Sequence, residues 1–206
     1  LSGQREDGAP YIIVDMICGA WGARPNRDGV EAITNASQNL SNTPVETLEL
    51  QHPVRVESYE PVADSCGAGR YRGGLGIQRS YRALADDALL QLRADRLKFA
   101  PYGLDGGMPA SVGKNLLERD GQTTSLPGKT AMRLKVGDLV THIQAGGGGF
   151  GNPLERDPVK VGSDVWNQII TAAYAHQKHG VVVDGLSGQV DMDATRLLRK
   201  ERMAAG

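Results

Sequence analysis

The chain has 206 residues, of which 40% are hydrophobic and 5% aromatic, and its 23 basic and 24 acidic side chains leave a formal net charge of −1. The chain therefore lacks the excess of positive charge that favours binding to nucleic acid or to an anionic membrane surface, so neither is expected as a partner. No apolar run approaches the roughly 18 residues of a membrane span, no signal peptide is visible, and two cysteines are too few for a disulfide scaffold, which together predict a cytoplasmic protein with free thiols.

Glycine is the outlier in the composition, with 27 residues, about twice its usual share of roughly 7%. The glycines gather in short blocks that have no fixed period. Such blocks predict many tight turns and favour a β-rich, loop-rich body. The chain opens on Leu1 without an initiator Met, so we expect a fragment or a processed piece rather than a complete enzyme.

The N-terminal fifty residues predict one strand followed by irregular chain. The β-branched run at 11–14 indicates the strand, and the loop at 18–29 follows it. The stretch from Thr34 to Thr43 is rich in amide and hydroxyl side chains, which make a poor helix and a poor strand. Because such side chains can replace backbone hydrogen-bond partners, we expect a fixed irregular loop there.

The next fifty residues are predicted to be β structure. Side chains alternate in polarity over 54–59, which indicates a half-buried strand. The segments 77–84 and 89–92 also have strand character. Asp86-Asp87 between them is a turn signal, so a hairpin is expected over 75–95.

Residues 100–151 are predicted to complete the β body. Asp120-Gly121 is the signal of a tight hairpin turn. Short strands are expected near 131–135 and 138–143, and the glycine block 146–151 ends the body.

The last fifty residues change to a helical pattern. Asp157 followed by proline predicts a helix that runs to about Trp166. Thr171 is expected to cap a second helix that stops at Gly180. A last helix is expected after a cap at Asp191 or Asp193. The whole pattern predicts an α+β fold, with a β-rich, glycine-loop-rich body over 1–151 and short helices over 152–206 packed on it.

Three side chains could act as a nucleophile or as metal ligands, but the surrounding sequence does not supply the partners that such a site needs. Cys66 would become nucleophilic if a neighbouring arginine lowered its pKa, but a small loop residue is the preferred interpretation. His176 and His179 have a spacing that can hold a metal. No third ligand stands near them, so a solvated helix face is expected.

Arg70 and Arg72 are the strongest candidates for binding. A pair of arginines one residue apart can clamp a carboxylate or a phosphate, or can pair with Glu46, Glu49 or Glu57 to fix the loop, and the sequence leaves both alternatives open. We expect the glycine-rich loop 65–76 to shape a functional interface through these two arginines. The candidate substrate-binding or interface residues are Arg70, Arg72, Glu46, Asn42 and His142, the last in a strand beside the glycine block.

The order of several short blocks resembles the hydantoinase B/oxoprolinase family. Asn42-Thr43-Pro44-Val45-Glu46, with Glu49, is similar to the family's N-x-P-V-E-x-x-E block, and Pro53 to Glu57 to its P-L-R-V-E block. Asp64 to Gly76 is similar to D-S-G-G-A-G-R-x-R-G-G-L-G, Gly103 to Gly107 to G-L-x-G-G, and Gly146 to Pro158 to G-G-G-G-Y-G-D-P-x-x-R-D-P. The departures are Cys66 for glycine, Phe150 for tyrosine and Asn152 for aspartate.

The resemblance implies a B component of an ATP-dependent enzyme that hydrolyses cyclic amides. A hydantoinase A-type partner would bind ATP and Mg²⁺ and phosphorylate the amide oxygen, and the B component would promote hydrolysis of the activated ring. Related assemblies carboxylate ketones such as acetone or acetophenone, which is the alternative. A non-catalytic structural or interaction piece of such a complex is the third interpretation.

The resemblance also implies what this chain does not contain. The family's metal-binding His and Asp residues lie in an N-terminal part of the B component that is absent here, where a metal ion is possible. We therefore expect no cofactor or metal in this chain, and we assign no catalytic residue. The expected partners are the A-type subunit, the N-terminal part of the B component, and a small cyclic amide or ketone substrate.

Overall fold

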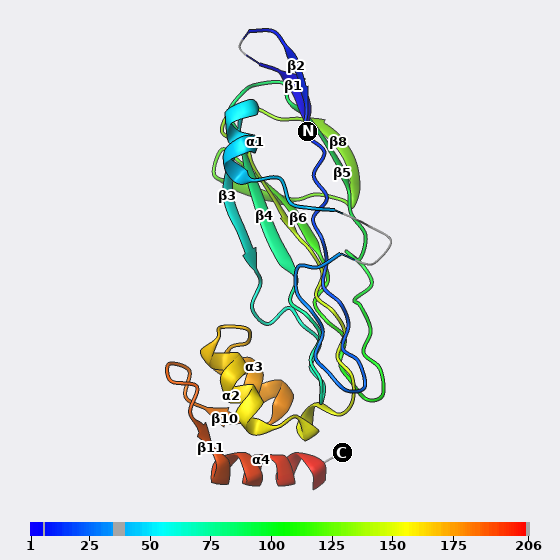
Figure 1. The fold of residues 1–206 in the computed structure, drawn as a ribbon, viewed down its shortest axis with the longest axis vertical. Coiled ribbons are helices and arrows are strands. Elements are labelled where there is room, and N and C mark those ends of the chain that lie inside the picture. Colours follow the sequence, from blue (N-terminus) through cyan, green and yellow to red (C-terminus); the bar gives the residue numbers. More distant parts are fainter. Residues whose placement is uncertain (6, 35–39, 205–206) are drawn as a thin grey trace.

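The computed structural model describes residues 1–5, 7–34 and 40–204. Figure 1 shows an elongated molecule, in which the β body occupies one end and the C-terminal helices occupy the other. The fold is α+β, as the sequence predicts. None of the helices in the described part of the chain is long and apolar enough to cross a membrane.

The larger sheet has five antiparallel strands in the order β3-β4-β9-β6-β7. They are β3 (Val54–Pro61), β4 (Ile77–Ala83), β9 (Leu139–Ile143), β6 (Lys114–Arg119) and β7 (Gln122–Ser125). Asp120 and Gly121 both have positive φ in the β6–β7 turn, which confirms the predicted hairpin. The strands expected at 54–59, 77–84 and 138–143 are confirmed by β3, β4 and β9.

The smaller sheet has four antiparallel strands in the order β2-β1-β5-β8. They are β1 (Ser2–Gln4), β2 (Pro10–Ile12), β5 (Leu89–Arg93) and β8 (Lys129–Arg133). The hairpin predicted over 75–95 is wrong, because β4 and β5 belong to different sheets. The chain crosses between the sheets at the Asp86-Asp87 turn, so that Ala83, Leu90 and Val140 meet in one apolar core.

A second apolar cluster holds α1 (Val45–Gln51) against the body. The sequence did not predict this helix, whose capping residue Pro44 makes no side-chain cap. Leu48 is buried with Tyr11, Ile13 and Val54, so tertiary burial stabilises a helix that local propensity does not mark. The irregular loop predicted over 34–43 lies in part outside the described residues, since 35–39 are not described.

Four extended segments, 19–30, 65–76, 101–108 and 145–151, continue from the sheets toward the helices (Figure 1). We call them the glycine bundle, because they pack backbone against backbone. Gly67 N donates to Gly147 O at 2.8 Å, and Gly147 N donates to Gly74 O at 2.9 Å. A Cβ atom on Gly73 would lie 1.8 Å from Gly147 O, so a side chain there has no room.

The C-terminal part is a small helical unit. Its elements are η1 (Pro153–Glu155), α2 (Pro158–Trp166), α3 (Ala172–Tyr174), η2 (Ala175–His179), β10 (Val182–Val183), β11 (Val190–Asp191) and α4 (Met192–Ala204). The caps expected from Asp157, Thr171 and Asp191 are confirmed, since each carboxylate or hydroxyl oxygen accepts backbone N–H bonds of its helix. The second helix continues as a π-helix over its last five residues before Gly180, whose φ is +59°.

The helical unit packs directly on the glycine bundle. Cys66 and Leu75 of the bundle share an apolar cluster with Val161, Val165 and Ile170 of the helical unit. Asp64, at φ 61°, accepts hydrogen bonds from both the backbone N–H and the hydroxyl of Thr171. The division of the chain into domains at residue 151 stays a prediction.

Candidate functional site

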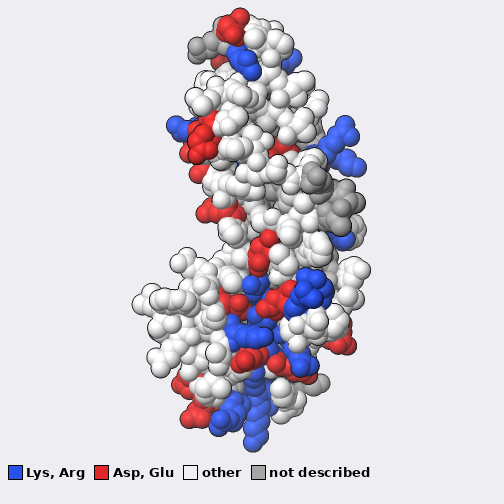
Figure 2. Space-filling view, viewed as in Figure 1, with Lys and Arg blue, Asp and Glu red and all other residues white. Residues whose placement is uncertain are grey.

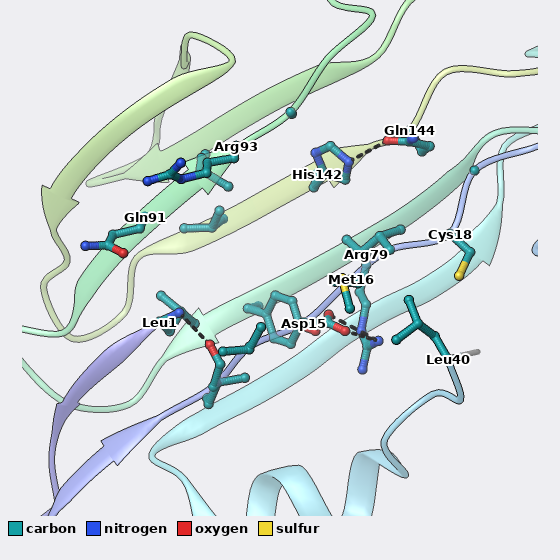
Figure 3. Close-up of a pocket in the computed structure, with 18 of the residues that line it drawn as sticks. Leu1, Asp15, Met16, Cys18, Leu40, Arg79, Gln91, Arg93, His142 and Gln144 are labelled. Carbon is teal, nitrogen blue, oxygen red and sulfur yellow. Dashed lines mark hydrogen bonds and ion pairs between the residues drawn. The ribbon is translucent and has the colours of Figure 1, made fainter. Parts of the chain in front are cut away.

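A groove of about 1120 Å³ opens between the two sheets. Residues 12–21 form one wall and residues 89–95, from β5 onward, form the other. Arg79 of β4 and His142 of β9 line the groove between these walls (Figure 3). The groove is therefore assembled from segments that are far apart in the sequence.

A row of polar side chains crosses the larger sheet in strict register. Tyr59 of β3 pairs with Arg79 of β4, Arg79 pairs with His142 of β9, and His142 pairs with Asn115 of β6. Residues that are directly paired on neighbouring strands lie on the same face of a sheet. We call these four side chains the polar row.

Arg79 is the most unusual member of the polar row, because its guanidinium is only 1% exposed. It lies 4.5 Å from the ring of Tyr59 and 5.2 Å from the ring of Tyr81. Nη1 donates to Asn42 Oδ1 at 2.8 Å and to Asp15 Oδ1 at 3.3 Å. Nε and Nη2 have no hydrogen-bond partner within the described residues. A buried cation with two unpaired donors is costly, and a negatively charged or strongly polar partner would offset that cost.

Asp15 connects Arg79 to a second buried side chain. The phenol of Tyr81 donates a hydrogen bond to Asp15 Oδ2. Burial, followed by the hydrogen bond to Asp15, raises the pKa of Tyr81 well above its usual range, so Tyr81 stays neutral. The carboxylate of Asp15 is therefore fixed by donors from two neighbouring positions on one face of β4.

His142 is held at both ring nitrogens. Nδ1 lies 2.6 Å from Asn115 Oδ1, and Nε2 lies 2.9 Å from the side-chain oxygen of Gln144. Burial lowers the pKa of His142, against the opposing effects of the Gln144 bond and the charge of Asp15, so the ring is neutral at neutral pH. The amide of Asn115 also donates to Pro127 O, which directs its oxygen to the ring. Both ring nitrogens of His142 are therefore occupied by side-chain amides, and the tautomer decides which of them carries the proton.

The structure brings two of the five candidate residues together here. Asn42 binds Arg79, and His142 is Arg79's partner in the register of the sheet. No role was predicted from the sequence for Arg79 or for Asp15. Alternation along β4 could have indicated that Arg79 and Tyr81 share a face, but no local signal identifies their partners on other segments.

Arg72 lies elsewhere, in a buried ion-pair network between the glycine bundle and the helical unit. Its Nη1 donates to Glu31 at 2.6 Å, and its Nε donates to Asp164 at 3.2 Å. Arg156 completes the network by binding Asp28 at 2.7 Å and Asp164 at 2.8 Å. We call these five residues the junction network. In Figure 2, side chains of both charges gather around the junction of the bundle with the helices.

The junction network corrects the expected pairing of Arg72. Its partners are not Glu46, Glu49 or Glu57, which were the glutamates weighed from the sequence. Glu49 instead accepts from the backbone N–H of Val56, and Glu57 binds Arg55 and Arg82.

Glu46 lies apart from the groove and the junction network, and Arg70 contacts the network only through its carbonyl oxygen, which accepts from Arg156 Nη1 at 3.2 Å. Arg70 is exposed beside the ring of Tyr71, and Glu46 is exposed in the first turn of α1. A binding role for these two residues stays a prediction.

Cys66 is buried, and its environment is not that of a nucleophile. Burial raises the pKa of its thiol to about 11, and the opposing charge of Arg72 does not compensate. The hypothesis that neighbouring arginines activate Cys66 is therefore wrong, and the alternative of a small packed residue holds.

The folded protein is expected to react with a thiol reagent such as dithionitrobenzoate at Cys18 alone. Cys18 is partly exposed, whereas Cys66 is buried and fully protonated at pH 8. The measurement is thiolate release with and without denaturant, for which we expect one and two equivalents. In Cys18→Ser, rapid release from the native protein would contradict the assignment.

His179 is also buried, contrary to the solvated helix face expected for the two histidines. Its Nδ1 lies 3.1 Å from Pro153 O, and its ring is 6.0 Å from the ring of Tyr174. The described part of the chain contains no group of three or more His, Cys, Asp or Glu side chains arranged to hold a metal ion. The metal spacing of His176 and His179 therefore does not extend to a third such ligand among these residues.

The buried ring of His179 predicts a loss of stability in acid. Burial lowers the pKa of His179 to about 4. The positive charges of Arg156 and Arg199 also lower this pKa, whereas the hydrogen bond to Pro153 O raises it. The unfolded value is near 6.5, so the stability is complete above pH 6.5 and is lost as the pH falls toward 4. In the wild-type chain, His179 makes the free energy of unfolding fall by about 2 kcal/mol between pH 7 and pH 4.5, and His179→Gln should abolish this part of the fall. Urea unfolding at several pH values tests this, with the exposed His176→Gln as a control that keeps the original profile.

The same fold occurs in solved enzymes that couple their chemistry to ATP. A nucleotide-free structure of acetone carboxylase, from work on ATP-dependent acetone carboxylation, matches 100% of this chain and 33% of its own chain with a TM-score of 0.83 at 22% identity, which shows the fold alone. The crystal structure of ATP-dependent caprolactamase from Pseudomonas jessenii covers 89% of this chain and 33% of its own with a TM-score of 0.75 at 26% identity.

The chain belongs to the hydantoinase B/oxoprolinase family, whose family model matches residues 1–153. The B component of a putative D-/L-hydantoinase of Pseudomonas sp. strain NS671 is 36% identical over 97% of this chain and 34% of that protein. The beta component of the caprolactamase of Pseudomonas jessenii is 30% identical over 91% of this chain and 33% of that protein. The chain thus spans about a third of the length of these relatives, which are named as subunits.

Proposed function

We propose that this chain is part of the B component of an ATP-dependent cyclic-amide hydrolase, and that its groove contributes to the site where the activated ring is opened. The observation that carries the proposal is the polar row. It places a buried guanidinium with two unpaired donors next to a neutral imidazole, beside the groove of a chain that belongs to this family.

The chemistry of a cyclic amide explains why such a groove is useful. An unstrained amide is a poor electrophile, and phosphorylation of its oxygen makes the carbon more electrophilic. Water adds to that carbon, the ring C–N bond breaks as the nitrogen takes up a proton, and the resulting acyl phosphate loses phosphate to a second water. Negative charge then develops on the oxygens near the reacting carbon. The unpaired Nε and Nη2 donors of Arg79 suit these oxygens once the side chains that bury them move aside, because preorganised donors in a water-poor site stabilise developing charge. The neutral ring of His142 suits the acceptance of a proton from an attacking water, once Gln144 releases its contact with Nε2.

The proposal places ATP and Mg²⁺ on a hydantoinase A-type partner. The Gly128-Lys129 pair of this chain does not complete a P-loop motif, since Thr123 stands where the motif needs a glycine five residues earlier. The remaining part of a B-type chain is the second proposed partner. A small cyclic amide is the proposed substrate.

Carboxylation of a ketone is the second candidate. It is favoured by the match of the whole chain to the fold of acetone carboxylase. The relatives named as hydantoinase and caprolactamase subunits are more similar in sequence, at 36% and 30% identity against 22% for that structure. Sequence similarity therefore favours the hydrolase.

The test is reconstitution of the chain with an A-type partner and the remaining part of a B-type chain. ADP release is measured with hydantoin, caprolactam or 5-oxoproline, and separately with acetone or acetophenone plus bicarbonate. We expect ADP release and ring opening with a cyclic amide only. Turnover with ketone and bicarbonate would favour the carboxylase, and equal turnover without this chain would make it a non-catalytic piece.

A further inference from the structure

One wall of the groove is a length of backbone without partners. Between β2 and Trp21 the chain runs in an extended path (Figure 1), yet residues 14–20 make no backbone hydrogen bond within the described part of the chain. The path is fixed at both ends, because Ile13 N donates to Leu1 O and Trp21 N donates to Val30 O. The side chains of Val14 and Met16 are 80% and 56% exposed.

The opposite wall is an open strand edge. β5 pairs with β8 at all five of its positions, but on its other side β1 reaches only Leu89. Along Leu90–Arg93 no described strand pairs with this second edge. An open edge beside exposed apolar side chains is a template for another strand.

Both open edges belong to the same groove. Residues 12–21 and 89–95 line it from opposite sides, and Figure 3 shows His142 between Gln91 and Arg93 on one side and Asp15 and Met16 on the other. Two unpaired backbones that face one groove satisfy the requirements for strand addition, in which backbone hydrogen bonds hold an incoming extended segment. Arg79, with its two buried and unpaired donors, also lines this groove.

We propose that the groove binds an extended, mostly apolar segment from the part of a B-type chain that this chain does not span. This occupant is favoured by length, because the chain covers only 34% of the hydantoinase B component that it matches. The choice of the remaining part of a B-type chain as the partner rests on the proposed function. The segment pairs with residues 14–20 or with the open edge of β5 and packs apolar side chains on Val14, Met16 and Ile17.

The docked segment also covers two members of the polar row. Arg79 and His142 line the groove between the two open edges, so a strand along either edge covers them and excludes bulk water. Exclusion of water strengthens the electrostatic effect of Arg79 on a bound oxygen.

The test measures binding and not activity, so that its failure is separate from a failure of the proposed function. The probe is the part of the Pseudomonas sp. strain NS671 hydantoinase B component that this chain does not match, about two thirds of that protein. Hydrogen–deuterium exchange of this full chain, alone and with the probe, is expected to show at least tenfold slower exchange at residues 14–20 or 90–93 in the complex.

Two variants at one position separate backbone pairing from side-chain contact. Met16→Pro removes an N–H that has no partner in the described chain, and Met16→Ala removes only the side chain. We expect at least tenfold weaker binding of the probe by Met16→Pro and a smaller effect of Met16→Ala, with melting temperatures unchanged in both. Failure of the probe to bind, protection confined to the glycine bundle or the helical unit, or equal binding by both variants would overturn the proposal.

Discussion

Arg156→Ala is expected to lower the free energy of unfolding by about 3–5 kcal/mol, because it removes one partner of a buried ion-pair network. Arg156 is 1% exposed and donates to both Asp28 and Asp164. Burial alone would raise the pKa of Asp28, yet its hydrogen bonds and charge interactions with Arg156 and Arg72 hold that pKa below its usual range. Without Arg156, two carboxylates would keep the desolvation penalty and lose most of their compensation.

Urea unfolding at pH 7 measures this effect, and the chain supplies a matched control. Arg196 forms an ion pair with Asp193 on α4, in which the two side chains are 78% and 92% exposed. Arg196→Ala should therefore change the free energy of unfolding by less than about 0.5 kcal/mol. Similar losses for the two variants would show that the junction network does not hold the helical unit to the glycine bundle.

Arg79→Gln is expected to lower the turnover of the reconstituted complex by about 10²- to 10³-fold, the usual cost of removing a donor that stabilises developing negative charge. The loss should fall on kcat more than on KM, because the donors act most strongly on the transition state. Arg79→Lys should restore only part of the rate, since an ammonium lacks the planar fork of donors.

The control for Arg79 lies on the same strand. Arg82 of β4 is half-buried, binds Glu57 and Gly137 O, and does not line the groove, so Arg82→Gln should leave kcat within about twofold. Melting temperatures are measured for all variants. Normal kcat in Arg79→Gln together with a lower melting temperature would assign Arg79 to structure and remove it from the site.

Local signals in the sequence predicted those elements whose stabilising contacts are local. Asp157 caps a helix through a bond to Val159, two residues away, and the Asp120-Gly121 turn forms within its own hairpin. The predicted 75–95 hairpin failed for the opposite reason. β4 finds its partners in β3 and β9, and the sequence between β4 and β5 gives no indication of that choice.

The site depends even more on distant contacts. Asn42 and His142 could be selected from the family block and from a strand, but their meeting at Arg79 depends on strand register and on a covering loop. Arg72 and Asp164 are 92 positions apart, and burial of both side chains, which the sequence does not report, decides their pairing. A glutamate nearby in the sequence was therefore a poor guide to the partner of a buried arginine.

The glycine bundle has a consequence for how the stability of this protein varies with temperature. Unfolding of an ordinary core exposes apolar side chains and raises the heat capacity, whereas exposure of polar backbone lowers it. The bundle joins its segments by hydrogen bonds between peptide groups, such as those of Gly67, Gly74 and Gly147, and glycine exposes no apolar side chain on unfolding. Its contribution to the heat-capacity change should be small or negative, which gives this protein a flatter stability curve than a side-chain core of equal length would give.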